Sequence, residues 1–144
     1  MAFAEAAKPD FAGYARRVVD DARALAEALT GEGLRMVSGG TDIHYLLADL
    51  GELDLTGAEA ETRLDAAGIS LNKNAIPFDP RPPMVASGIR VGTASVATQG
   101  MDPAEMVEIA HLIGRVLKAP GDVEAVRADV AELVGRFPVY PELA

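Results

Sequence analysis

A 22-residue run from Asn72 to Thr93 places the strongest constraint on how this 144-residue chain can fold. The run is apolar in character, contains four prolines, and carries two amide side chains near its start and Arg90 near its end. Connections of this length are uncommon in compact domains and usually carry function. We therefore expect this segment to hold functional side chains.

Charge and composition exclude several classes of function. The chain has 13 basic and 22 acidic residues and a net charge of -9, which argues against a nucleic-acid backbone or an anionic membrane surface as a partner. The absence of cysteine excludes disulfides and thiolate chemistry, and two histidines are too few for an ordinary histidine-rich metal site. No apolar run approaches the roughly 18 residues of a membrane span, and no signal peptide opens the chain. We expect a cytoplasmic protein.

Four segments show the apolar period of a helix with one buried face. They span residues 10–30, 56–67, 102–117 and 123–136. The second and third open with an acceptor side chain followed three residues later by Glu, which is the capping-box spacing. The adjacent acids Asp20 and Asp21 lie off the apolar stripe of the first helix, which predicts that both are solvated.

Short apolar runs between turn residues predict strands at 34–37, 45–50, 69–71 and 88–93. A chain of this length fits one domain that buries a core. Together the elements predict a small two-layer α/β (α+β) fold, in which a sheet of three or four short strands has its helices mainly on one face. The pattern leaves the order of the strands open.

Arg90 lies between Ile89 and Val91, so in a strand its side chain points away from theirs. Its planar guanidinium can hold a carboxylate in two parallel hydrogen bonds, a task that lysine performs less well. A solvated arginine on the sheet surface is the alternative that periodicity leaves open.

Asn72 and Asn74 can both donate and accept, so they could recognise the edge of a heterocycle, although asparagine is also common in turns. Lys73 between them could form a Schiff base, but the local sequence supplies no group that would activate it, and an ion-paired lysine is the simpler interpretation. The segment 38–42, Ser-Gly-Gly-Thr-Asp, lacks the Gly-Lys ending of a phosphate-binding loop, so we interpret it as a tight turn beside His44.

Four blocks of sequence resemble the C-terminal part of serine hydroxymethyltransferase, and the resemblance extends from about Phe3 to Leu117. The blocks are Gly-Leu-Arg-Met-Val-Ser-Gly-Gly-Thr-Asp (33–42), Leu-Thr-Gly-Ala-Glu-Ala-Glu (55–61), Gly-Ile-Ser-Leu-Asn-Lys-Asn-Ala-Ile-Pro (68–77) and Ser-Gly-Ile-Arg-Val-Gly-Thr (87–93).

This resemblance implies a fold and an activity. The family has the fold of the aspartate-aminotransferase type (fold type I) and uses pyridoxal 5'-phosphate to interconvert serine and glycine, with tetrahydrofolate receiving the one-carbon unit. The chain would correspond to the small C-terminal domain. Its parts would be an interdomain-type helix (1–32), the α/β core (33–118) and a C-terminal helix with a tail (119–144), and the complete enzyme would be a homo-oligomer.

The resemblance also implies roles for individual residues. Arg90 falls on the arginine that binds the α-carboxylate of the amino-acid substrate, and Asn74 falls on an asparagine that contacts the folate. Pro82, Pro83 and Met84 fall on a folate-contacting tripeptide that in many members reads Ser-Pro-Phe, so only Pro83 is identical. A further departure is Ile43, where many members have asparagine.

No residue of this chain matches the lysine that carries the cofactor, and Lys73 does not share its motif. The resemblance therefore implies a piece of the enzyme that holds substrate-binding residues, lacks catalytic residues of its own, and is inactive without the lysine-bearing domain. The alternative is a freestanding, non-catalytic α/β module for ligand binding or interaction.

Overall fold

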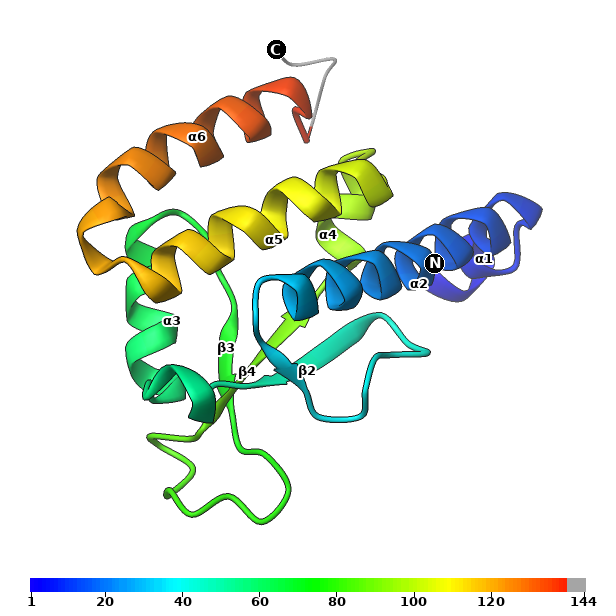
Figure 1. Cartoon of the computed structure of the whole chain (residues 1–144). Coiled ribbons are helices and arrows are strands. Elements are labelled where there is room, and N and C mark those ends of the chain that lie inside the picture. The colour runs from blue at the N-terminus through cyan, green and yellow to red at the C-terminus, as the bar shows by residue number, and fades with distance from the viewer. Residues whose placement is uncertain (140–144) are drawn as a thin grey trace.

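The computed structural model describes residues 1–139, which form six α-helices and one four-stranded sheet (Figure 1). The elements in chain order are α1 (Ala2–Ala6), α2 (Pro9–Gly31), β1 (Arg35–Met36), β2 (Tyr45–Asp49), the 3-10 turn η1 (Gly51–Leu53), α3 (Gly57–Ala66), β3 (Asn72–Asn74), β4 (Gly88–Gly92), α4 (Ala94–Thr98), α5 (Pro103–Lys118), the 3-10 turn η2 (Pro120–Asp122) and α6 (Val123–Arg136). Among residues 1–139, no helix combines the length and apolar character that crossing a membrane requires.

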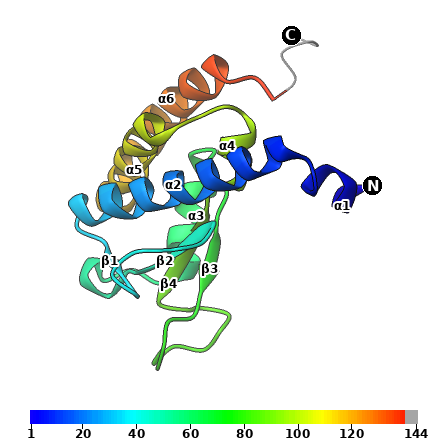
Figure 2. The same cartoon turned by 90° about the vertical axis from the view of Figure 1, so that its right-hand side faces the viewer.

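The sheet has the strand order β1-β2-β4-β3, and every neighbouring pair is antiparallel. Strand β4 is one of the two inner strands: Leu47 of β2 lies opposite Arg90 on one side, and Asn72 of β3 lies opposite it on the other. Helices α2, α5 and α6 lie on one side of this sheet, and the views show no helix over its other face (Figures 1 and 2). The two-layer fold predicted from the sequence is therefore confirmed.

The core lies between the sheet and the helical layer. Its central residues are completely or almost completely buried: Leu25, Leu29, Leu46, Leu64, Ile89, Met106, Ile113, Val116 and Val126. Both predicted capping boxes are present, one from Thr56 and Glu59 at the start of α3 and one from Asp102 and Glu105 at the start of α5. They satisfy backbone N–H groups that a helix terminus otherwise leaves without partners.

Three details of the secondary structure differ from the sequence prediction. The strand expected at 69–71 lies instead at Asn72–Asn74, so the connection without regular structure is shortened to residues 75–87. Helices α1 and α4, which have five residues each, were not predicted from the sequence. Five residues are too few to display a periodic apolar face.

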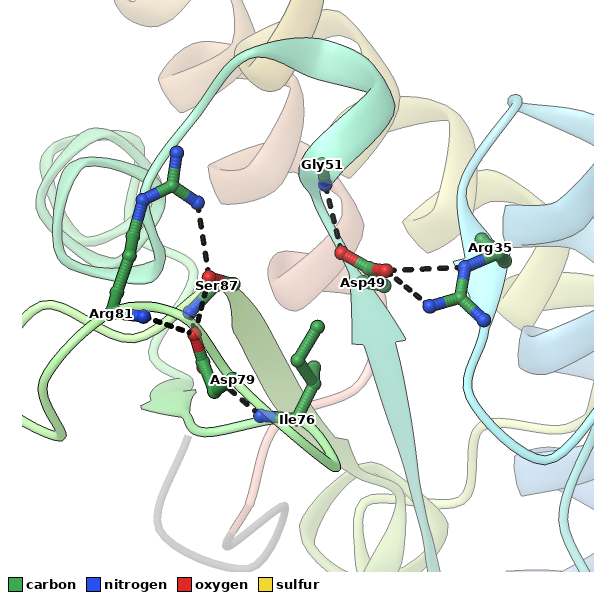
Figure 3. A network of polar contacts seen from close by, with 7 residues as sticks. All are labelled: Arg35, Asp49, Gly51, Ile76, Asp79, Arg81 and Ser87. Atoms are coloured by element: carbon green, nitrogen blue, oxygen red, sulfur yellow. Dashed lines mark hydrogen bonds and ion pairs between the residues drawn. The ribbon is translucent and has the colours of Figure 1, made fainter.

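Asp79 organises the long connection between β3 and β4 (Figure 3). Its carboxylate accepts hydrogen bonds from the backbone N–H groups of Ile76 (3.1 Å), Arg81 (2.9 Å) and Ser87 (2.9 Å), and from the Ser87 hydroxyl (2.6 Å). The Ser87 hydroxyl and the three backbone donors lower the pKa of Asp79 to about 2. The Asp79 side chain thus joins the start and the end of the connection, which has no regular structure of its own.

The end of this connection is fixed to α3 by its backbone. The first N–H groups of α3, at Gly57 and Ala58, donate to the carbonyls of Ala86 and Val85, each at 3.0 Å. A Cβ atom added to Gly57 would lie 2.5 Å from the carbonyl oxygen of Gly88, so only glycine allows α3 and β4 to approach this closely.

Asp21 contradicts the sequence prediction, because it is completely buried while its neighbour Asp20 is exposed. Neither carboxylate oxygen of Asp21 has a hydrogen-bond partner among the described residues. Burial raises its pKa to about 6; Arg17 acts against this rise, whereas Asp102, Asp20 and Glu105 add to it. The packing of α2 against the body of the fold therefore favours the neutral acid.

We predict that Asp21→Asn raises the free energy of unfolding at neutral pH by about 1–3 kcal/mol, since an amide avoids the cost of a buried charge. Because the folded-state pKa is above the ordinary value of 3.8, the contribution of Asp21 to stability is greatest below about pH 4 and is lost as the pH rises to about 6. Urea unfolding of both proteins across this pH range measures the difference. The matched variant Asp20→Asn should keep the decline, and a decline that persists in Asp21→Asn would contradict the prediction.

We predict that Asp79→Asn loosens the 75–87 connection, because an amide cannot accept all four hydrogen bonds that this carboxylate accepts. Amide hydrogen exchange at Ile76, Arg81 and Ser87 should accelerate by about tenfold or more. The low pKa of Asp79 means that the parent protein keeps this order above about pH 4 and loses it as the pH falls towards 2. Asp54→Asn, an exposed change outside the connection, is the control, and unchanged exchange in Asp79→Asn would refute the role of Asp79.

Candidate functional site

Arg90 projects from the face of the sheet that carries no helix. Its neighbours in sequence, Ile89 and Val91, are buried beneath the helices at 0% and 8% exposure, whereas Arg90 is exposed. This confirms the direction predicted from the alternation of side chains along a strand. Because β4 is an inner strand, Arg90 has a neighbouring strand on each side of it on the uncovered face.

Two neutral groups contact the Arg90 guanidinium. Its Nη2 donates to the side-chain oxygen of Asn72 at 3.3 Å, and its Cζ lies 5.7 Å from the centre of the Tyr45 ring. Within residues 1–139, Arg90 makes no ion pair with a carboxylate, in contrast to Arg23, Arg35, Arg115 and Arg136. The guanidinium has five N–H donors, so most of them stay available for a ligand.

Asn72 was a candidate from the sequence, but its contact with Arg90 was not predicted, and Tyr45 was not among the candidates. Asn72 lies directly opposite Arg90 in the β3–β4 pair, and Tyr45 lies on β2 opposite Gly92. These neighbours depend on strand order and register, which the pattern of one chain leaves open. The apolar run at 45–50 was the one available signal, since it placed Tyr45 in a strand.

Asn74 lies on the same face as Asn72 and Arg90, because residues two apart in a strand point the same way. Its side-chain amide donates to the carbonyl oxygen of Ala75 at 2.8 Å, and Asn74 is half-buried. This contact uses one N–H group and leaves the side-chain oxygen without a partner among residues 1–139.

Pro82, Pro83 and Met84 form an exposed turn near the end of the connection, and 78% of Met84 is exposed. The carbonyl of Pro82 accepts hydrogen bonds from the N–H groups of Val85 and Ala86, each at 2.9 Å. The connection leaves the sheet where Asn74 pairs with Gly88, which is two strand residues, or roughly 7 Å, from Arg90. The structure thus joins Arg90 and Asn74 on one face and places the proline turn beyond the end of their strands.

Lys73 points to the opposite side of β3 from the two asparagines. Its Nζ lies 2.5 Å from a carboxylate oxygen of Glu61 on α3, and its backbone N–H donates to the other oxygen at 3.1 Å. The Lys73 contacts lower the pKa of Glu61 and keep the pair charged. The ion-paired interpretation of Lys73 is confirmed, and its amine is not available as a nucleophile.

The other two lysines are also ion-paired. Lys8 Nζ lies 2.7 Å from Glu5, and Lys118 Nζ lies 2.8 Å from Glu32. All three lysines of the chain therefore have carboxylate partners. Their arrangement does not fit the attachment of an aldehyde cofactor, which requires a free, desolvated amine in a pocket.

The Ser38–Asp42 segment forms the tight turn expected from its sequence. The Thr41 hydroxyl donates to the carbonyl of Tyr45 at 2.6 Å, and Asp42 forms an ion pair with Arg23 of α2 at 3.0 Å. The carbonyl of His44 accepts the N–H of Thr93 at 3.1 Å. No group of side chains among residues 1–139 has the composition of a metal site.

Comparison with known protein families identifies the family to which this fold and site belong. The family model described as serine hydroxymethyltransferase matches residues 1–113, which is 113 of the 144 residues. The match covers the whole sheet, the connection between β3 and β4, and the strand that carries Arg90. The mixed α/β fold agrees with the C-terminal domain of that family. The chain belongs to the serine hydroxymethyltransferase family.

Proposed function

We propose that this chain supplies the substrate-binding surface of a serine hydroxymethyltransferase, in which Arg90 binds the α-carboxylate of serine or glycine. Membership of the family implies a pyridoxal-phosphate-dependent glycine hydroxymethyltransferase that uses serine, glycine and folate. The observation that carries the proposal is the environment of Arg90, which is exposed on an uncovered sheet face and held by an amide and a ring.

This environment suits recognition of a carboxylate. Asn72 and Tyr45 restrict the guanidinium without neutralising it, so the positive charge stays available to an anion. A carboxylate can accept two parallel hydrogen bonds from the planar fork, which orients the amino acid as well as binding it. Orientation of this kind lowers the entropic cost of the chemical step that follows.

Asn74, Pro82, Pro83 and Met84 form the proposed folate-contacting surface. Asn74 shares the face of Arg90, and the proline turn is exposed at the end of a connection that Asp79 keeps ordered. The free side-chain oxygen of Asn74 can accept a hydrogen bond from a heterocycle, and Pro82 to Met84 offer apolar contacts to a flat ring.

The cofactor-bearing lysine belongs, in this proposal, to a domain other than the one described by residues 1–139. The three lysines of this chain are ion-paired, so we assign none of them to pyridoxal phosphate. When bound, that group supplies the electron sink for the reaction, and the residues of this chain bind and orient the substrates beside it. The working enzyme is then a homo-oligomer that contains both parts.

We predict that Arg90→Lys raises the apparent KM for serine by roughly 10- to 100-fold, because an ammonium group cannot form the two parallel hydrogen bonds of the guanidinium. Steady-state kinetics would be measured on the enzyme assembled from this chain and the cofactor-bearing domain of a family member. Arg127→Lys, an exposed change on α6, serves as the matched control and should leave KM unchanged. An unchanged KM in Arg90→Lys would contradict the carboxylate role.

We predict that this chain alone forms no glycine from serine when pyridoxal phosphate and tetrahydrofolate are supplied, because no free lysine is present to hold the cofactor. Adding the cofactor-bearing domain should produce turnover, and the same mixture with Arg90→Leu should not reach that rate. Turnover by the chain alone would refute this assignment. Absence of turnover in the complete mixture would favour the alternative of a non-catalytic module.

A further inference from the structure

The surroundings of Arg90 differ from those of Arg35 and Arg115, which stabilise the fold through ion pairs. Arg35 pairs with Asp49 on the same sheet face (Figure 3), and Arg115 pairs with Asp122 and Asp129 between α5 and α6. Those guanidinium groups are neutralised by carboxylates. Arg90 has contacts of similar number, but both come from uncharged groups.

The contact with Asn72 depends on the register of β3 and β4. Asn72 is directly opposite Arg90, and its side-chain oxygen accepts one hydrogen bond from Nη2 at 3.3 Å. A carboxylate at this place would have the same shape and could accept the same hydrogen bond, but it would also neutralise the guanidinium. The amide therefore orients Arg90 and preserves its charge.

The contact with Tyr45 depends on the register of β2 and β4. Tyr45 lies opposite Gly92, two residues beyond Arg90 on β4, so its ring reaches Arg90 along the diagonal between the strands. The His44 ring packs edge-on against Tyr45 with 5.0 Å between the ring centres, which gives the Tyr45 ring a second contact.

We propose that Asn72 and Tyr45 are positioning residues, which hold the Arg90 guanidinium in place for the substrate carboxylate while leaving it unneutralised. This inference rests on the proposed function of Arg90. It assigns the two residues to substrate recognition through Arg90, and neither of them is required to touch the substrate. The Tyr45 hydroxyl makes no hydrogen bond within residues 1–139, so the ring alone should be sufficient.

The first test is Asn72→Asp in the assembled enzyme described above. The new carboxylate would form an ion pair with the Arg90 guanidinium and so compete with the carboxylate of the substrate. The apparent KM for serine should therefore rise by about tenfold or more, while kcat at saturating serine and the KM for tetrahydrofolate change little. Ser70→Asp adds the same charge at an exposed site before β3 and should leave all three constants unchanged. Thermal unfolding of the full chain checks that the variants stay folded.

The second test separates the ring of Tyr45 from its hydroxyl. Tyr45→Leu should raise the KM for serine several-fold, and Tyr45→Phe should restore the parent value because it keeps the ring over Arg90. If Tyr45→Leu only destabilised the fold, it would lower the unfolding temperature without a selective change in the KM for serine. In that case Tyr45→Phe would not specifically restore this KM.

Arg90→Leu makes the two possible failures distinguishable. If Arg90→Leu leaves the KM for serine unchanged, the proposed function of Arg90 is wrong and the positioning inference fails with it. If Arg90→Leu raises this KM but Asn72→Asp and Tyr45→Leu do not, the proposed function stands and the positioning inference alone is overturned. A rise in all three variants, with recovery in Tyr45→Phe, supports both.

Discussion

The alternation of side chains along β4 is the constraint on which the rest of this structure depends. Ile89 and Val91 are buried beneath the helices, so the residue between them in β4, Arg90, must point to the other face. Shifting the register by one residue would expose two apolar side chains and bury a guanidinium, at a cost of several kcal/mol. The packing that stabilises the domain thus also fixes the direction of Arg90.

The connection between β3 and β4 shows how a segment without regular structure can hold a defined shape. The connection has no strand pairing to order it. Instead, the Asp79 carboxylate accepts hydrogen bonds from the backbone N–H groups of three residues and from one hydroxyl. Gly57 allows α3 to approach β4, and the first N–H groups of α3 bind the end of the connection. Met84 and its neighbouring prolines can therefore remain exposed in an ordered turn.

The amino-acid sequence predicted the helices well because their signals are local. The capping boxes at Thr56 and Asp102 and the long apolar stripes depend on spacings of three and four residues within one segment. β3 was misplaced because its three residues, Asn-Lys-Asn, have low strand propensity and pair only through their contact with β4. Asp21 was wrongly assigned to solvent on the strength of its charge, although it lies three residues after Val18 and four before Leu25, so the helical period places it on the buried face.

The sequence by itself determined the layered fold, the outward direction of Arg90 and, through the resemblance of its blocks, the family to which the chain belongs. It also determined that Lys73 lacks the surroundings of a reactive amine. Only the tertiary structure decided the strand order, and with it the contacts of Asn72 and Tyr45 with Arg90. The physical reason is that side-chain direction follows from the period of one strand, whereas neighbours across strands follow from packing of the whole chain.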